Sequence, residues 1–179
     1  ASHQIAASVA TVVFMAPLAL GIAASARISH WLGAGQPARA RHAAAVGMAA
    51  TAVLAACTAS LIALAAGPIA RLYVGDAAIA AAAAALLPAV AAYHLGDALQ
   101  AASLFALRSY RITTLPFVIY AVLLWGLGLP AGHALAFTGL GPWPAWRSPL
   151  AFWCAIALAQ GLAGLTLAAT LWRAALKKR

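Results

Sequence analysis

The sequence predicts an all-α protein, a polytopic membrane helix bundle with five transmembrane helices. Composition is the first reason, because 66% of the 179 residues are hydrophobic and only 7% are charged, whereas soluble domains carry about 25% charged residues. The second reason is that five stretches contain the roughly 20 mostly apolar residues that a helix needs to cross a hydrocarbon core about 30 Å thick. The third is that basic residues gather in alternate loops between these stretches.

Each apolar stretch is expected to be helical, because lipid offers the backbone no hydrogen-bond partners and a helix satisfies its own peptide groups. Most of the charged residues lie in the loops between these stretches. The expected spans cover residues 4–26, 44–66, 79–107, 115–137 and 150–172.

Prolines and small residues indicate where these helices bend or approach one another. Pro17 in the first span, Pro88 in the third and Pro130 in the fourth each remove a backbone hydrogen bond and favour a kink. The fourth span also carries Gly128 and Gly132, a spacing that permits close helix packing.

The distribution of Lys and Arg predicts the orientation in the membrane. One set of loops, together with the C-terminal segment, carries nine basic residues: Arg27, Arg39, Arg41, Arg108, Arg111, Arg173, Lys177, Lys178 and Arg179. The alternate loops carry two, Arg71 and Arg147. Because cytoplasmic loops are enriched in Lys and Arg, the C-terminus is expected in the cytoplasm and the N-terminal end outside. The net charge of +9 is thus a topology signal, and no nucleic-acid partner is expected.

Tryptophans near the ends of the spans fit the membrane–water interface, where an amphipathic ring meets the lipid headgroups. Trp31 and Trp172 lie near cytoplasmic ends, and Trp143 and Trp146 lie on the outer side. The segment 139–149, which is rich in Gly, Pro and Trp, is therefore expected to be an irregular outer loop within the interface.

The chain has only two acidic side chains, Asp76 and Asp97. Asp97 lies 11 residues before Arg108, about 16 Å along a helix and close to the midplane of the membrane. A carboxylate there costs about 2.5–3.5 kcal/mol on insertion scales, so such residues usually face a bundle interior or a watery cavity and serve ion or proton pathways. The alternative is an acid that is paired only for packing. Asp76 precedes the Ala-rich start of the third span, where a helix cap explains it.

Tyr93 and Gln100 lie on the same helical face as Asp97, four residues before it and three after it. Their hydroxyl and amide groups can donate to the carboxylate or help to coordinate a hard cation such as Na⁺. A proton and a cation would then compete for one carboxylate, which is a physical basis for ion-coupled transport. For Gln100, a hydrogen-bond cluster that only packs helices is an alternative. For His94, helix packing is the first interpretation and a proton relay the second.

The sequence offers little for catalysis. It contains no Ser-His-Asp arrangement, phosphate-binding Gly loop or paired carboxylates, and its five histidines show no metal-ligand spacing. We therefore expect no enzyme, no transition-metal site and no cofactor, with H⁺ or Na⁺ as the coupling ion.

The chain opens Ala-Ser-His-Gln, without an initiator Met, a basic n-region or a signal peptidase site. It is therefore expected to be a fragment. A first helix that enters the membrane from outside also requires at least one preceding span for a cytoplasmic start.

Several short motifs follow one another along nearly the whole chain. They are Ala1-Ser2-His3-Gln4-Ile5, Phe14-Met15-Ala16-Pro17-Leu18, Gly33-Ala34-Gly35, Tyr93-His94-Leu95-Gly96-Asp97, Leu107-Arg108-Ser109-Tyr110, Trp125-Gly126-Leu127-Gly128-Leu129-Pro130 and Ala151-Phe152-Trp153. In this order they resemble the NorM-type branch of the MATE (multidrug and toxic compound extrusion) transporters, from the eighth helix onwards.

The resemblance implies a twelve-helix antiporter with two six-helix lobes, in which residues 1–179 form part of the C-terminal lobe, helices eight to twelve. It also implies that Asp97 is the cation- or proton-coupling aspartate, Tyr93 its neighbouring tyrosine and Gln4 a glutamine that lines the drug cleft. The missing partners would be the N-lobe and the seventh helix, which carries a further acidic coupling residue.

The leading interpretation is a fragment of an H⁺- or Na⁺-coupled efflux antiporter for drugs and small organic cations, embedded in the lipid bilayer of a bacterial inner membrane. One alternative is a non-transporting membrane scaffold or subunit, in which Asp97 faces a protein contact. Another is a lipid-linked sugar flippase of the wider superfamily. A flippase would need basic residues along its central cavity, whereas the arginines here lie near span ends.

Overall fold

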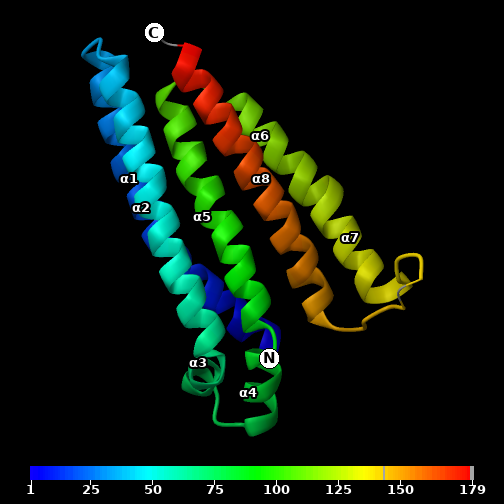
Figure 1. The fold of residues 1–179 in the computed structure, drawn as a ribbon. Coiled ribbons are helices and arrows are strands. Elements are labelled where there is room, and N and C mark those ends of the chain that lie inside the picture. The colour runs from blue at the N-terminus through cyan, green and yellow to red at the C-terminus, as the bar shows by residue number, and fades with distance from the viewer. Residues whose placement is uncertain (143, 178–179) are drawn as a thin grey trace.

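A computed structural model describes residues 1–142 and 144–177 as a bundle of long helices (Figure 1). Trp143, Lys178 and Arg179, which the sequence assigns to the outer loop and the basic C-terminal segment, lie outside the described residues. The helical elements are α1 (Ser2–Gly33), α2 (Pro37–Leu64), α3 (Ala66–Tyr73), α4 (Ala77–Ala84), α5 (Leu87–Ser109), α6 (Thr114–Ala121), η1 (Val122–Gly128), α7 (Leu129–His133), η2 (Ala134–Thr138) and α8 (Pro149–Lys177).

Four continuous helical stretches are long and apolar enough to cross a membrane: Ser2–Gly33, Pro37–Leu64, Thr114–Thr138 and Pro149–Lys177. A fifth span results when α4 and α5, which are bent by 40°, are taken together. The helices run alternately up and down, so that the N-terminus and the α3–α4 connection lie at one end and the C-terminal end of α8 at the other (Figure 1). The prediction of an all-α membrane helix bundle is therefore confirmed.

The helices continue past the predicted spans. α1 has 32 residues, about 48 Å of helix, and ends at Gly33, seven residues beyond the predicted limit. The backbone stays helical until the 34–36 turn, where Gly35 has a positive φ of 69°. α2 then starts with Pro37 at its first position, where the missing N–H would have had no partner in the helix.

The bend between α4 and α5 has its cause in Pro88. A proline clashes with the carbonyl of the residue four positions earlier and cannot donate to it. That residue is Ala84, at which α4 ends, and the helix resumes at Leu87 with Pro88 in its first turn. The kink expected at Pro88 is thus present, displaced toward the N-terminus by about one turn.

Pro130 distorts the fourth span in a different way. It lies in the short helix α7, which is flanked by the π-helical segments η1 and η2. The residue four positions before Pro130 is Gly126, within η1, and a wider π turn relieves the clash that a regular helix would have there. Pro17, by contrast, lies inside α1, which continues through it as one helix.

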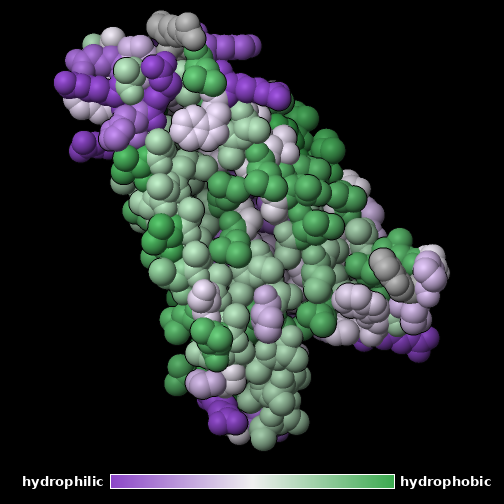
Figure 2. Space-filling view, in the orientation of Figure 1, coloured by the Kyte–Doolittle hydropathy of each residue, from purple (hydrophilic) through white to green (hydrophobic). Residues whose placement is uncertain are grey.

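α5 is the central element of the bundle, because it packs against α1, α2 and α8. Many of its buried positions are alanines, which allow neighbouring helices to approach closely. The other helices are apolar on their outward faces as well, and Figure 2 shows hydrophobic side chains along most of the visible surface of the bundle. In a membrane such faces contact lipid or further helices.

Charged side chains mark the two ends of the bundle. In Figure 2 the hydrophilic side chains gather mainly at the end that carries the α1–α2 turn. At the opposite end Asp76 caps α4, and its Oδ1 accepts a hydrogen bond of 2.9 Å from the backbone N–H of Ile79. The prediction that Asp76 is a helix cap is confirmed.

Candidate functional site

Asp97 lies in the middle of α5 and is buried, with 8% of its surface exposed. It lines a cavity of about 320 Å³ together with Tyr93 and Gln100. The structure therefore brings the three residues of the predicted polar stripe to one cavity. The rest of the lining comes from two other helices: Ala10, Thr11 and Phe14 of α1 and Tyr120 of α6.

A further polar side chain, from α8, contacts the carboxylate of Asp97. Gln160 of α8 is 1% exposed, and its Nε2 donates a hydrogen bond of 2.7 Å to Asp97 Oδ1. Its Oε1 is buried and has no hydrogen-bond partner among the described residues. Because a hydrogen bond from an amide favours the charged form of a carboxylate, Gln160 stabilises Asp97 in its ionised state.

Glycines at the crossing of α5 and α8 bring Gln160 close to Asp97. A Cβ atom on Gly96 would lie 2.6 Å from the backbone N of Gly161 and 2.8 Å from the carbonyl carbon of Gln160. A Cβ atom on Gly164 would lie 2.8 Å from the backbone O of Gly96. The two backbones are in direct contact here, and only glycine fits at both positions.

The ring of Tyr93 is fixed by an aromatic contact. It meets the ring of Trp153 of α8 edge-to-face, with 5.7 Å between the ring centroids and an interplanar angle of 82°. The ring of Trp153 also contacts His3 of α1, at 5.8 Å between centroids. Such pairs stabilise a defined ring orientation, so Tyr93 keeps its place in the wall of the Asp97 cavity.

His94 is directed to a different neighbour. It is 1% exposed, and its Nε2 lies 2.7 Å from Thr58 Oγ1 of α2. It is not part of the lining of the Asp97 cavity. The contact joins α2 to α5, which fits the packing interpretation of this histidine better than a proton relay.

Gln4 lies apart from the other predicted site residues. It is exposed in the first turns of α1, seven residues before Thr11 and therefore on the same helical face, about 10 Å nearer the N-terminus. It does not line the Asp97 cavity. Its assignment to a drug cleft stays a prediction.

Gln160, Tyr120 and Thr11 were not predicted from the sequence to belong to this site. A signal was available for Gln160, since an amide within an otherwise apolar span is itself an unusual, costly residue. Its partner could not be read from the sequence, because Gln160 and Asp97 are 63 residues apart and meet only through helix packing.

Most of the polar groups that line this cavity are oxygen donors or acceptors. A carboxylate, two phenol groups, a hydroxyl and an amide surround it, and oxygen ligands are those that hard cations prefer. No group of three or more His, Cys, Asp or Glu side chains among the described residues could hold a metal ion.

Comparison with solved structures identifies the fold class. The chain superposes on the crystal structure of a eukaryotic MATE transporter, AtDTX14, with a TM-score of 0.86 and 21% sequence identity, over 99% of this chain and 40% of that one. The fold is therefore that of a MATE transporter, and the chain is a multi-pass membrane protein.

Sequence comparison identifies the family. The chain belongs to the MatE family, whose sequence model matches residues 1–133, and the resemblance stated from the motifs is confirmed. It is 44% identical over 138 residues to the multidrug resistance protein PmpM of Pseudomonas aeruginosa, covering 77% of this chain and 29% of that protein.

Two further relatives cover almost the entire chain. The multidrug resistance protein MdtK of Pectobacterium atrosepticum is 39% identical over 171 residues, which is 96% of this chain and 36% of that protein. The multidrug resistance protein NorM of Burkholderia vietnamiensis is 38% identical over 183 residues, 99% of this chain and 37% of that protein. The chain thus spans about a third of the length of the curated relatives it matches.

Proposed function

We propose that this chain is part of the C-terminal lobe of a multidrug efflux antiporter that exchanges H⁺ or Na⁺ for drugs and small organic cations. The observation that carries the proposal is the carboxylate of Asp97, buried at mid-helix in a cavity with Tyr93 and Gln100. Membership of the MatE family and the names of the multidrug resistance relatives support efflux as the activity.

Exchange follows from the chemistry of one buried carboxylate. With a proton or Na⁺ bound, Asp97 is neutralised; when the ion leaves, the negative charge remains, stabilised by the amide of Gln160. The ion and a cationic drug then each bind more tightly to a different state of the protein. Movement of the ion down its gradient therefore drives export of the drug. The residues act by binding and neutralisation, so the activity is that of a transporter and not of an enzyme.

In this proposal the five spans are helices eight to twelve of a twelve-helix protein in a bacterial inner membrane. The C-terminus faces the cytoplasm and the N-terminal end of the chain faces outward. The partners are the lipid bilayer, the N-lobe and the seventh helix, and Gln4 lines the drug cleft between the lobes.

The test is Asp97→Asn in the full-length transporter, because Asn keeps the shape of the side chain and removes the charge. We expect coupled drug efflux to fall to background while the amount of protein in the membrane is unchanged, measured as efflux of a fluorescent cation from cells. Asp76→Asn is the matched control, since it removes the other acid of the chain and Asn still caps a helix.

Efflux by Asp97→Asn that equals the unmodified protein at equal expression would contradict the proposal. That outcome would favour a packing role for Asp97 and the scaffold alternative.

A further inference from the structure

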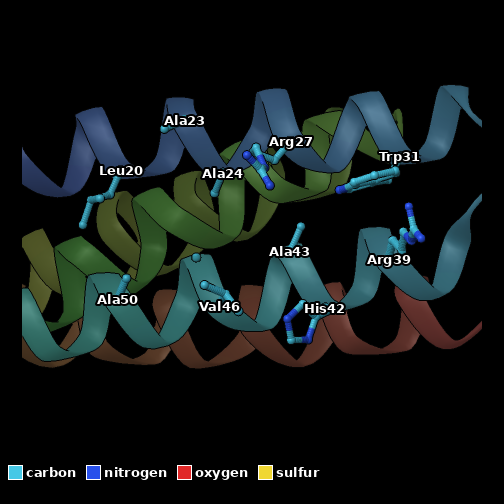
Figure 3. Close-up of a pocket in the computed structure, with 11 residues that line it drawn as sticks. Leu20, Ala23, Ala24, Arg27, Trp31, Arg39, His42, Ala43, Val46 and Ala50 are labelled. Carbon is cyan, nitrogen blue, oxygen red and sulfur yellow. The ribbon is translucent and has the colours of Figure 1, made fainter.

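A second cavity, of about 510 Å³, lies between α1 and α2 and shares no lining residue with the Asp97 cavity. We propose that it binds an anionic phospholipid, with the phosphate at the cationic end of the groove and an acyl chain along the apolar remainder. The cationic side chains of the groove are Arg27 and Arg39, and His42 also lines it. Figure 3 shows Arg39 and Trp31 toward one end of the groove and Arg27 and His42 nearer its middle, with α1 on one side and α2 on the other.

The two arginines come from different helices and line the same groove. Arg27 lies on α1, while Arg39 lies at the start of α2, beyond the tight turn at 34–36. The guanidinium of Arg39 is held over the ring of Trp31, 4.7 Å from its centroid. Arginine is suited to phosphate because its planar N–H groups can donate two parallel hydrogen bonds, and stacking on an aromatic ring orients that plane in advance.

No side-chain carboxylate of the described residues lines this groove. The only side-chain carboxylates are Asp76 and Asp97. Asp76 caps α4 at the opposite end of the bundle, and Asp97 lines the other cavity. Two positive charges without an acidic neighbour, at the level of a membrane surface, attract anionic lipid headgroups, and basic pockets between transmembrane helices are known to bind them.

The rest of the groove fits an acyl chain. Its walls are apolar and follow the helix axes away from the arginines: Leu20, Ala23 and Ala24 on α1, and Ala43, Val46, Gly47 and Ala50 on α2. Leu20 is seven residues from Arg27, which corresponds to about 10 Å of apolar groove. Arg39 and Trp31 lie at the end of the groove nearest the 34–36 turn, Arg27 lies one helical turn further along α1, and the apolar walls follow. This order corresponds to that of headgroup and hydrocarbon in a lipid. The proposal requires only that the helices span a membrane and does not depend on ion coupling.

The test measures lipid binding to the purified full-length protein by native mass spectrometry, in titrations with phosphatidylglycerol, phosphatidylcholine and inorganic phosphate. The double variant Arg27→Gln/Arg39→Gln should weaken phosphatidylglycerol binding about thirtyfold, from about fivefold for each arginine. The matched control is Arg108→Gln/Arg173→Gln, which removes two exposed arginines at the same end of the bundle that do not line the groove. It should leave the affinity unchanged.

A third variant tests the apolar part of the groove. Ala50→Phe fills it without changing any charge, so phosphatidylglycerol should bind more weakly although both arginines are present. Thermal unfolding of each variant without added lipid shows that the fold is intact.

Three results would overturn the proposal. Equal loss of binding in the two double variants would indicate diffuse attraction by surface charge. Equal affinity for phosphatidylcholine and phosphatidylglycerol would show that the arginines do not select an anion. Displacement of the lipid by inorganic phosphate at equal concentration would assign the site to free phosphate.

Discussion

The hydrogen bond from Gln160 to Asp97 determines how well the buried site tolerates a negative charge. It is a bond of 2.7 Å between two buried side chains and is charge-assisted when Asp97 is ionised. Bonds of this kind contribute about 1.5–3 kcal/mol, and a carboxylate that loses one is left poorly compensated in a medium of low polarity. The ion affinity of Asp97 should therefore depend on a residue that the coupling ion need not touch.

We expect Gln160→Leu to change the concentration of coupling ion that gives half-maximal efflux by about ten- to hundredfold, which corresponds to the loss of that one bond. Leu has a similar size, so the packing of α8 is largely kept. The measurement is drug efflux by the full-length protein in proteoliposomes, titrated with H⁺ and with Na⁺ separately.

Thr166→Val is the control for this prediction, because Thr166 is an exposed residue of the same helix whose hydroxyl donates only to the backbone O of Leu162. It should not shift the ion titration. An unshifted titration in Gln160→Leu would mean that the contact with Asp97 does not influence ion binding.

Among the individual residues of the Asp97 cavity, the sequence predicted those that lie on one helix, α5. Tyr93, Asp97 and Gln100 were found because helical spacing places them on one face. Gln160 and Tyr120 lie on α8 and α6. Helix packing decides which face of each of these helices meets α5, and no local sequence pattern specifies that packing.

At the scale of elements, the crossing of α5 and α8 sets the geometry of the site. Gly96 precedes Asp97, and Gly161 follows Gln160, so the closest backbone contact and the hydrogen bond between the side chains are one structural feature. Small residues at helix crossings are a general means of close packing in membranes.

Gly96→Ala should therefore destabilise the full-length protein by about 1–3 kcal/mol, the usual cost of overpacking. The added Cβ would meet backbone atoms of α8 at 2.6–2.9 Å, and backbone cannot rotate away. Gly161→Ala is the control, since nothing lies within 4 Å of its Cβ position. We expect a lower temperature of thermal unfolding for Gly96→Ala only. An equal unfolding temperature in both variants would show that the crossing is looser than described.

The three prolines within the helices show how much of the backbone geometry a local sequence signal can predict. Three prolines within spans gave the same expectation of a kink, yet α1 continues through Pro17, the helix breaks before Pro88 and π turns surround Pro130. A proline removes one hydrogen bond in each case. The surrounding packing decides whether the backbone breaks or widens, so the form of the distortion could not be predicted.

For the whole molecule, hydropathy and charge were sufficient to predict the class of fold. The constraint is strong because a helix in lipid must satisfy its own backbone and be long enough to cross. The described chain leaves large apolar faces on α1, α2 and α6 to η2 exposed, so the sequence alone could not show which of them meet lipid and which meet other helices.

The orientation of the bundle is testable through its two ends. Gln36 lies in the α1–α2 turn at the end rich in arginine, and Gly75 lies in the α3–α4 connection at the opposite end; both are exposed.

In a full-length variant with every native cysteine replaced, including Cys57 and Cys154 of this chain, Gln36→Cys should react with a membrane-impermeant maleimide only after the membrane is opened. Gly75→Cys should react in intact spheroplasts. The expected pattern follows because an excess of Lys and Arg holds a loop in the cytoplasm. The opposite labelling pattern would show that the topology is inverted. Reaction of both cysteines from outside would mean that α2 does not cross the membrane.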